Sequence, residues 1–174
     1  IREAIDYILV EKGYPEELLD STASTLETIA RAVTFLKEHN LDWETAQKEA
    51  EQYLEDQELK AASKAVVIDG AEHVLKILRE LKKKVGVITR NNRKVALQVL
   101  KECGLHNYVD VLLTRDDVDK VKPHPDHVFQ AMKELDSSPE RTVVVGDHRF
   151  EIEAGTRAGC FTVGVLTGSG TKKT

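Results

Sequence analysis

Apolar residues follow two different patterns along the chain, one in residues 1–63 and another from residue 64 onward. In the first segment they recur every three or four positions, which is the period of an amphipathic helix. The two clearest stripes are Ile1, Ala4, Ile5, Ile8 and Leu9, and then Leu26, Ile29, Ala30, Val33 and Leu36. Asp42 fits the N-cap of a further helix through Leu59, and Trp43 fits a core anchor. This segment therefore predicts a small helical bundle.

The second segment alternates short β-rich runs with helical stripes, a pattern typical of a parallel sheet covered by helices. Predicted strands span residues 85–89, 108–113, 141–145 and 161–165, and predicted helices span 71–81, 93–103, 125–135 and 151–158. The run Val143 to Val145 predicts a strand buried on both faces. In the helix predicted over residues 71–81, the positions expected to face inward are Val74, Ile77, Leu78 and Leu81. Residues 167–171 predict a terminal loop.

Composition narrows the functional classes. Apolar residues make up 41% of the 174 positions and charged residues 32%, and the net charge is −5. Without a long basic block, we expect no nucleic-acid or membrane-surface role. No apolar run reaches the ~20 residues of a membrane span, and no secretory signal is recognisable. Cys103 and Cys160 fit small core residues in a reducing compartment, so we expect a cytoplasmic protein.

Candidate chemistry begins after the predicted strand that ends at Val145. Gly146 allows a tight turn, and Asp147 follows at the carboxyl end of the strand, where open α/β sheets place their ligands. Glu151 falls in the first turn of the next predicted helix and can point back toward Asp147. Two converging hard carboxylates suit Mg²⁺. The alternative is a helix-capping Asp147 beside a solvated Glu151.

Two further stretches could hold an anion. Thr89 ends a predicted strand and is followed by Arg90, Asn91 and a helix N-terminus, whose free N–H groups and hydroxyl can donate to an oxyanion. The alternative is an ordinary strand threonine, with Asn92 as the helix N-cap. In the second stretch, prolines stiffen the backbone after Lys122, so its ammonium can be fixed beside an anion, where it stabilises developing charge. The alternative is a surface lysine.

The ordered set of strand–Thr89, Lys122–Pro, and Gly–Asp147 with Glu151 resembles the haloacid dehalogenase-like (HAD) hydrolase superfamily, especially phosphoglycolate phosphatase-like members with a helical cap. The resemblance implies an α/β fold, in which a Rossmann-like parallel core of residues 64–174 follows an all-α cap of residues 1–63. It implies Mg²⁺-dependent hydrolysis of a small phosphomonoester through an aspartyl phosphate.

The resemblance also assigns roles to individual residues. Thr89 and Lys122 become catalytic, Thr89, Arg90, Asn91 and Lys122 contact the substrate, and Asp147 and Glu151 hold the metal. The cap is expected to choose the substrate, whose identity stays open, as does the oligomeric state.

One motif of the family is missing. Members open with a strand that ends in Asp-x-Asp, whose first aspartate attacks phosphorus, and the sequence contains no such motif. Asp69-Gly70 imitates part of it without the first aspartate. We therefore expect a chain that begins downstream of the nucleophile. An inactive relative that binds a phosphorylated ligand or a protein is the alternative. A metal-independent dehalogenase fits the two acidic residues less well.

Two expectations follow from these departures. In the family the missing strand lies between the strands that end at Thr89 and at Asp147, so these two should not pair with each other. A chain left with those unpaired edges should be unstable or aggregate by itself. The other departure is His148, where the family has a small residue, and we expect its side chain to point outward.

Overall fold

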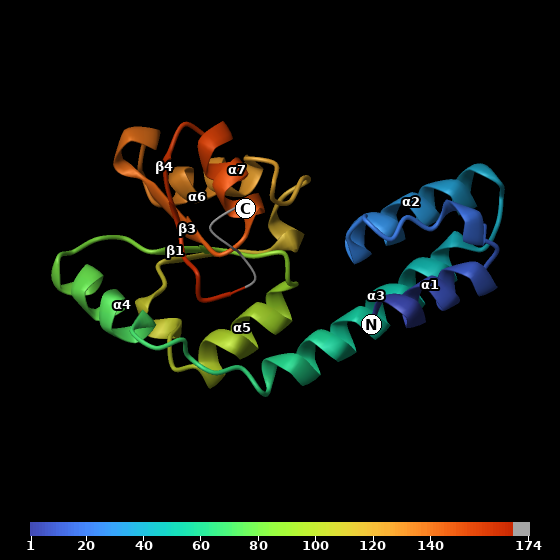
Figure 1. The fold of residues 1–174 in the computed structure, drawn as a ribbon, viewed down its shortest axis with the longest axis horizontal. Coiled ribbons are helices and arrows are strands. Elements are labelled where there is room, and N and C mark those ends of the chain that lie inside the picture. Colours follow the sequence, from blue (N-terminus) through green and yellow to red (C-terminus); the bar gives the residue numbers. More distant parts are fainter. Residues whose placement is uncertain (169–174) are drawn as a thin grey trace. The chain divides into compact units, whose positions relative to one another are not determined.

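The computed structural model describes residues 1–168 and is drawn in Figure 1. It divides into two compact units, Ile1–Ala61 and a second that begins at Ala62. Within the described part of the chain, every helix is too short or too polar to cross a membrane. The predicted terminal loop falls mostly on residues 169–171, which lie outside the described residues.

The first unit is entirely helical. Its elements are α1 (Arg2–Glu11), the 3-10 turn η1 (Glu16–Leu18), α2 (Thr25–Glu38) and α3 (Trp43–Ala62). The start of α3 is capped as predicted, because the Asp42 carboxylate accepts from the backbone N–H of Thr45 at 3.1 Å. The helix continues beyond the predicted end at Leu59, and no proline or glycine interrupts it there.

The predicted apolar stripes form the core of the first unit, except Ile1 and Ala30, which are exposed. Its buried members are Ile5, Leu9, Tyr14, Ile29, Ala32, Val33, Leu36, Ala46, Ala50 and Leu54. Trp43 packs against this core, and the ammonium of Lys37 lies 3.9 Å from the centre of its ring. The first unit therefore buries its own hydrophobic faces.

The second unit alternates strands and helices. Its main elements are α4 (Ala71–Glu80), β1 (Gly86–Ile88), α5 (Arg93–Glu102), β2 (Val111–Leu113), α6 (Asp126–Glu134), β3 (Val143–Gly146), α7 (Arg149–Arg157) and β4 (Phe161–Gly164). Short 3-10 turns lie at His106–Tyr108, Arg115–Asp117 and Pro139–Arg141. Tyr108 thus lies in a turn rather than in the predicted strand.

All strand pairs of the second unit are parallel, as predicted. In residues 1–168, β1 pairs only with β2, and β3 pairs only with β4. Gly86 is opposite Val111 in the first pair, and Val143 is opposite Phe161 in the second. The strands that end at Thr89 and Asp147 therefore do not pair with each other, as the sequence led us to expect.

Helix α7 packs closely on the second sheet because Gly155 has no side chain. A Cβ atom at this position would lie 2.7 Å from Thr162 and 2.9 Å from Val144. Val144 is buried among residues of α6 and α7, including Val128 and Ala154. In Figure 1, α6 and α7 lie beside β3 and β4, whereas α4 lies well apart from α6. This packing fixes the start of α7 next to the end of β3.

Two burial predictions were wrong. Val143 and Val145 are exposed, at 55% and 58%, so β3 is buried on one face only. Helix α4 also leaves its apolar side exposed, including Val74, Ile77 and Leu81. Both errors have one cause, because period and composition identify an apolar face but not the element that covers it. Among the described residues, no element covers these faces.

Candidate active site

Lys122 brings the predicted motifs together. Its side chain is 8% exposed, and its ammonium lies 2.6 Å from the Glu151 carboxylate. The same ammonium donates to the carbonyl oxygen of Ile88 at 3.1 Å. Because Ile88 precedes Thr89 and Glu151 stands in the first turn of α7, the lysine joins the end of β1 to the start of α7. The alternative of a surface lysine is thus wrong. Lys122, which precedes the predicted stiff backbone, is a buried and paired cation.

The loop after β1 is built by short-range hydrogen bonds. The backbone N–H of Thr89 continues the sheet by donating to Leu113 at 2.9 Å, and the Thr89 hydroxyl accepts from the N–H of Asn91 at 3.1 Å. Asn92 caps α5 by accepting from the N–H of Val95 at 2.8 Å. The Thr89 hydroxyl can still donate its hydrogen at the strand end, so the Asn92 cap is compatible with the predicted anion cradle, which stays a prediction.

The turn after β3 depends on Gly146. A Cβ atom at Gly146 would collide with the side chain of Glu151, so only glycine lets this carboxylate fold back over the strand end. One Glu151 oxygen binds Lys122, and the other accepts from the backbone N–H of His148 at 3.2 Å. Glu151 therefore serves as a helix-capping residue and as the counter-ion of the lysine.

His148 caps α7 rather than pointing outward. Its Nδ1 atom accepts from the backbone N–H of Phe150 at 3.2 Å, and its ring lies edge-on to Phe150 with 4.3 Å between centres. The side chain is partly buried. The predicted outward orientation was wrong because the capping role of histidine is set by backbone geometry, which residue type alone does not reveal.

A metal ion would find an incomplete set of protein ligands here. Asp147 places a carboxylate at the end of β3, and the two oxygens of Glu151 accept from Lys122 and from the backbone N–H of His148. The backbone of Gly168 lies against the Asp147 carboxylate. No group of three His, Cys, Asp or Glu side chains in residues 1–168 could hold a metal. The chemistry of Asp147 fits Mg²⁺, which takes one or two carboxylates together with water and substrate phosphate.

A polar network that the sequence analysis missed holds the loop between β2 and Lys122, with Thr114 and His127 buried and Asp117 and Arg93 nearer the surface. Asp117 accepts from both the N–H and the hydroxyl of Thr114 at 2.7 Å, and Arg93 donates to Asp117 at 2.6 Å. The ring Nε2 of His127 lies 2.9 Å from the carbonyl oxygen of Thr114. The spacing Thr114-x-x-Asp117 was a recognisable capping signal. The network fixes the segment that leads to Lys122.

The electrostatics of this network favour a charged Asp117 and a neutral His127. Burial raises the pKa of Asp117, but hydrogen bonds from Thr114 and Arg93 more than offset it and bring the pKa to about 2. Burial lowers the pKa of His127 below its ordinary value. A neutral His127 can donate one N–H to Thr114, which fixes its tautomer.

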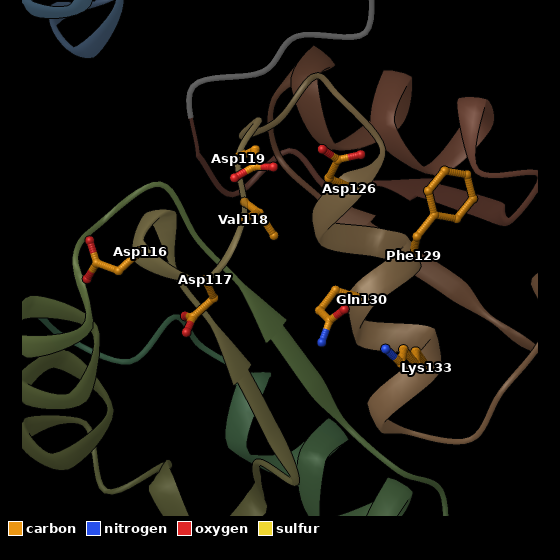
Figure 2. A pocket seen from close by; sticks show the side chains of 8 residues that line it. All are labelled: Asp116, Asp117, Val118, Asp119, Asp126, Phe129, Gln130 and Lys133. Carbon is orange, nitrogen blue, oxygen red and sulfur yellow. The ribbon is translucent and has the colours of Figure 1, made fainter.

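A separate cavity of about 500 Å³ opens beside this network. It is lined by Asp116, Asp117, Val118, Asp119, Asp126, Phe129, Gln130 and Lys133 (Figure 2). Neither Thr89, Lys122 nor Asp147 lines it. Since four of its side chains are carboxylates, the cavity would repel an anion, and we place the candidate active site at Lys122 instead.

The parallel strands and capped helices define an α/β core, in which the buried Lys122 joins the end of β1 to the start of α7. The sequence profile of the haloacid dehalogenase-like hydrolases matches residues 1–165, and the chain belongs to this family.

Among curated proteins, the chain is similar to the pyrophosphatase PpaX of Bacillus mycoides, with 39% identity over 102 residues. This match covers 57% of the chain and 47% of the relative. A PpaX protein of Bacillus thuringiensis is 38% identical over 102 residues, and this match covers the same fractions of the two chains. The chain thus spans about half the length of the curated relatives it matches.

Solved structures show the same fold. A HAD-superfamily hydrolase of Geobacter sulfurreducens matches with a TM-score of 0.60 and 21% identity, over 92% of the chain and 78% of that structure. A hydrolase of Streptococcus pneumoniae matches with a TM-score of 0.57 and 17% identity, over 95% of the chain and 86% of that structure. These structures confirm the predicted α/β class, and the sequence profile confirms the predicted family.

Proposed function

We propose that this chain forms part of a Mg²⁺-dependent phosphatase that hydrolyses a small phosphorylated substrate through an aspartyl phosphate. The observation that carries the proposal is the buried Lys122 ammonium, which is bonded to Ile88 beside Thr89 and to Glu151 near Asp147. The family match and the pyrophosphatase name of the Bacillus relatives support a phosphoryl-transfer reaction.

Each residue has a distinct role in the proposal. The Thr89 hydroxyl and the N–H groups of the following loop orient the transferring phosphoryl group, and Lys122 stabilises the negative charge that develops on it. Glu151 positions Lys122 through the 2.6 Å ion pair. Arg90 and Asn91 complete the substrate contacts.

Hydrolases of this family generally use a divalent metal ion, and Asp147 would hold it here. A bound Mg²⁺ would neutralise charge on the phosphate oxygens.

The proposed chemistry conserves atoms in two displacements. A carboxylate oxygen attacks phosphorus, the bond from phosphorus to the leaving oxygen breaks, and the leaving group departs with a proton. Water then attacks the aspartyl phosphate, which releases phosphate and restores the carboxylate. In this proposal the attacking carboxylate is neither Asp147, which would hold the metal, nor Glu151, which is paired with Lys122. The nucleophile is another aspartate.

The test measures phosphate release from p-nitrophenyl phosphate with Mg²⁺, using the whole protein. Replacing Lys122→Met should lower kcat by on the order of 10²-fold with a smaller change in KM, because the charge acts mainly in the transition state. Lys120→Met, an exposed lysine in the same loop, is the matched control and should behave like the wild type.

Circular dichroism of the Lys122→Met protein must show that it is folded, because removing the lysine leaves Glu151 without its counter-ion. A folded variant with the wild-type kcat, or a wild-type protein that releases no phosphate, would contradict the proposal.

A further inference from the structure

Two guanidinium groups meet at the ring of Phe150, at the start of α7. The Cζ atom of Arg90 lies 5.3 Å from the ring centre, and that of Arg149 lies 5.4 Å from it. Arg90 directly follows Thr89 after β1, whereas Arg149 is the second residue after Asp147. The ring therefore joins one cation from each of the two loops that carry the candidate active site.

Neither of these arginines has a carboxylate partner in residues 1–168, in contrast to four other arginines of the chain. Arg2, Arg31, Arg93 and Arg157 each form an ion pair with a nearby carboxylate. Within residues 1–168, no ion pair involves Arg90 or Arg149. The Nε atom of Arg90 is also buried and has no hydrogen-bond partner. Neither guanidinium therefore has a protein counter-charge among these residues, and a bound anion would supply one.

We propose that Arg90 and Arg149, supported by Phe150, form a subsite for a second anionic group of the substrate. This inference rests on the proposed function, in which Thr89 and Lys122 hold the reacting phosphoryl group. The second group is a phosphoryl or a carboxylate, because the planar guanidinium pairs with two oxygens of either. Stacking on Phe150 restricts the arginine side chains before binding, which lowers the entropy lost when the ligand binds.

The subsite selects a class of substrate. A diphosphate or a phosphorylated carboxylic acid can occupy both anion positions, whereas the phosphate ester of an uncharged alcohol fills only one. We therefore expect selectivity to depend on the loop after β1 and on the first residues of α7, the two places that contribute Arg90 and Arg149.

The first test measures binding, which needs no turnover. Calorimetry at fixed ionic strength gives the Kd values of inorganic pyrophosphate, phosphoglycolate and inorganic phosphate for the wild-type protein, Arg149→Gln and Arg141→Gln. Arg149 and Arg141 are both exposed, so neither change should unfold the protein, and Arg141 lies outside the subsite. The wild type should bind at least one of the two-anion ligands about tenfold or more tightly than phosphate.

In Arg149→Gln this preference should fall about fivefold or more, and in Arg141→Gln it should persist. Loss of preference for pyrophosphate alone identifies a phosphoryl as the second group, and loss for phosphoglycolate alone identifies a carboxylate; loss for both shows that the subsite accepts either. An unchanged preference in Arg149→Gln, or no preference in the wild type, overturns the subsite.

The second test separates this inference from the proposed function. The ratio of kcat/KM for pyrophosphate or phosphoglycolate to that for p-nitrophenyl phosphate is compared among the same proteins. If the protein hydrolyses these compounds and the ratio does not depend on Arg149, the subsite is rejected and the proposed phosphatase activity stands. Arg149-dependent binding of pyrophosphate or phosphoglycolate by a protein that hydrolyses none of the three compounds keeps the subsite and rejects the phosphatase.

Discussion

The helical unit and the α/β unit place their apolar and polar residues in opposite ways. Helices α1 to α3 bury their stripes against one another, and Thr28 is their one buried polar residue among those described. In the α/β unit the apolar sides of α4, β3 and β4 are exposed, yet Asn92, Thr114, Lys122 and His127 are buried. The first unit is thus stabilised mainly by hydrophobic burial, whereas the second buries polar groups that shape a site.

The largest stability effect that this comparison predicts lies in the helical unit. Leu36 is fully buried there, so Leu36→Ala should lower the free energy of unfolding by about 2–5 kcal/mol. The single Trp43 lies in the same unit, so its fluorescence during urea denaturation reports the change. Leu18→Ala, at an exposed leucine, is the control and should cost within about 0.5 kcal/mol. Equal losses in the two variants would contradict a closed core.

The next effect concerns the polar network around Thr114 and His127 in the α/β unit. His127→Phe removes the hydrogen bond to the Thr114 carbonyl and leaves that buried oxygen without its partner. We expect a loss of about 1–3 kcal/mol. Labelling of the thiols of Cys103 and Cys160 during urea denaturation reports this unit, because both cysteines lie in it. A variant as stable as the wild type would show that the network does not stabilise the loop.

The same network makes a pH prediction. Burial lowers the pKa of His127 below its ordinary value of 6.5, so the unfolded chain takes up a proton more readily than the folded one. The wild type should therefore lose stability as the pH falls below about 6.5, and His127→Phe should lose less. Asp117 contributes only at lower pH, between its ordinary pKa of 3.8 and about 2. Identical slopes between pH 7 and 5 in the two proteins would refute the assignment to His127.

The smallest effect is expected on the exposed face of β3. Val145 lies opposite Val163 on β4, and both are exposed, at 58% and 47%. Val145→Thr should change the free energy of unfolding by no more than about 0.5 kcal/mol while reducing the binding of an apolar dye. Thiol labelling and dye fluorescence measure the two quantities. A loss as large as that of Leu36→Ala would mean that this face is buried in solution.

The exposed faces also bear on the expected instability of the chain. Strands β1 and β3 do not pair with each other, and apolar side chains of β3 and β4 are open to solvent. Such edges and faces promote self-association, so that expectation stays a prediction that sedimentation can check.

Local signals predicted most of the secondary structure. The order of helices and strands, the Asp42 cap and the parallel pairing all agree with the predictions from period, capping residues and alternation. Thr89 and Asp147 also directly follow strand ends, and Lys122 lies in the loop before α6, as predicted. Hydrogen bonds within a few residues and the geometry of one helix or strand determine these features, and the sequence contains that information directly.

The tertiary structure alone decided which groups meet. Glu151 was predicted as a metal ligand, and that role stays a prediction, but the structure pairs it with Lys122, 29 positions away. His127 reaches Thr114 across 13 positions, and Arg90 reaches Phe150 across a longer separation than that of Glu151 and Lys122.

The exposure of α4 and β3 was also decided by the tertiary structure, because burial depends on which elements pack together. The order of the elements and the family could be predicted from the sequence, and the positions assigned to chemistry stay predictions. Only the packing of distant segments determined the partners of each charge, because a contact between residues far apart leaves no local pattern in the chain.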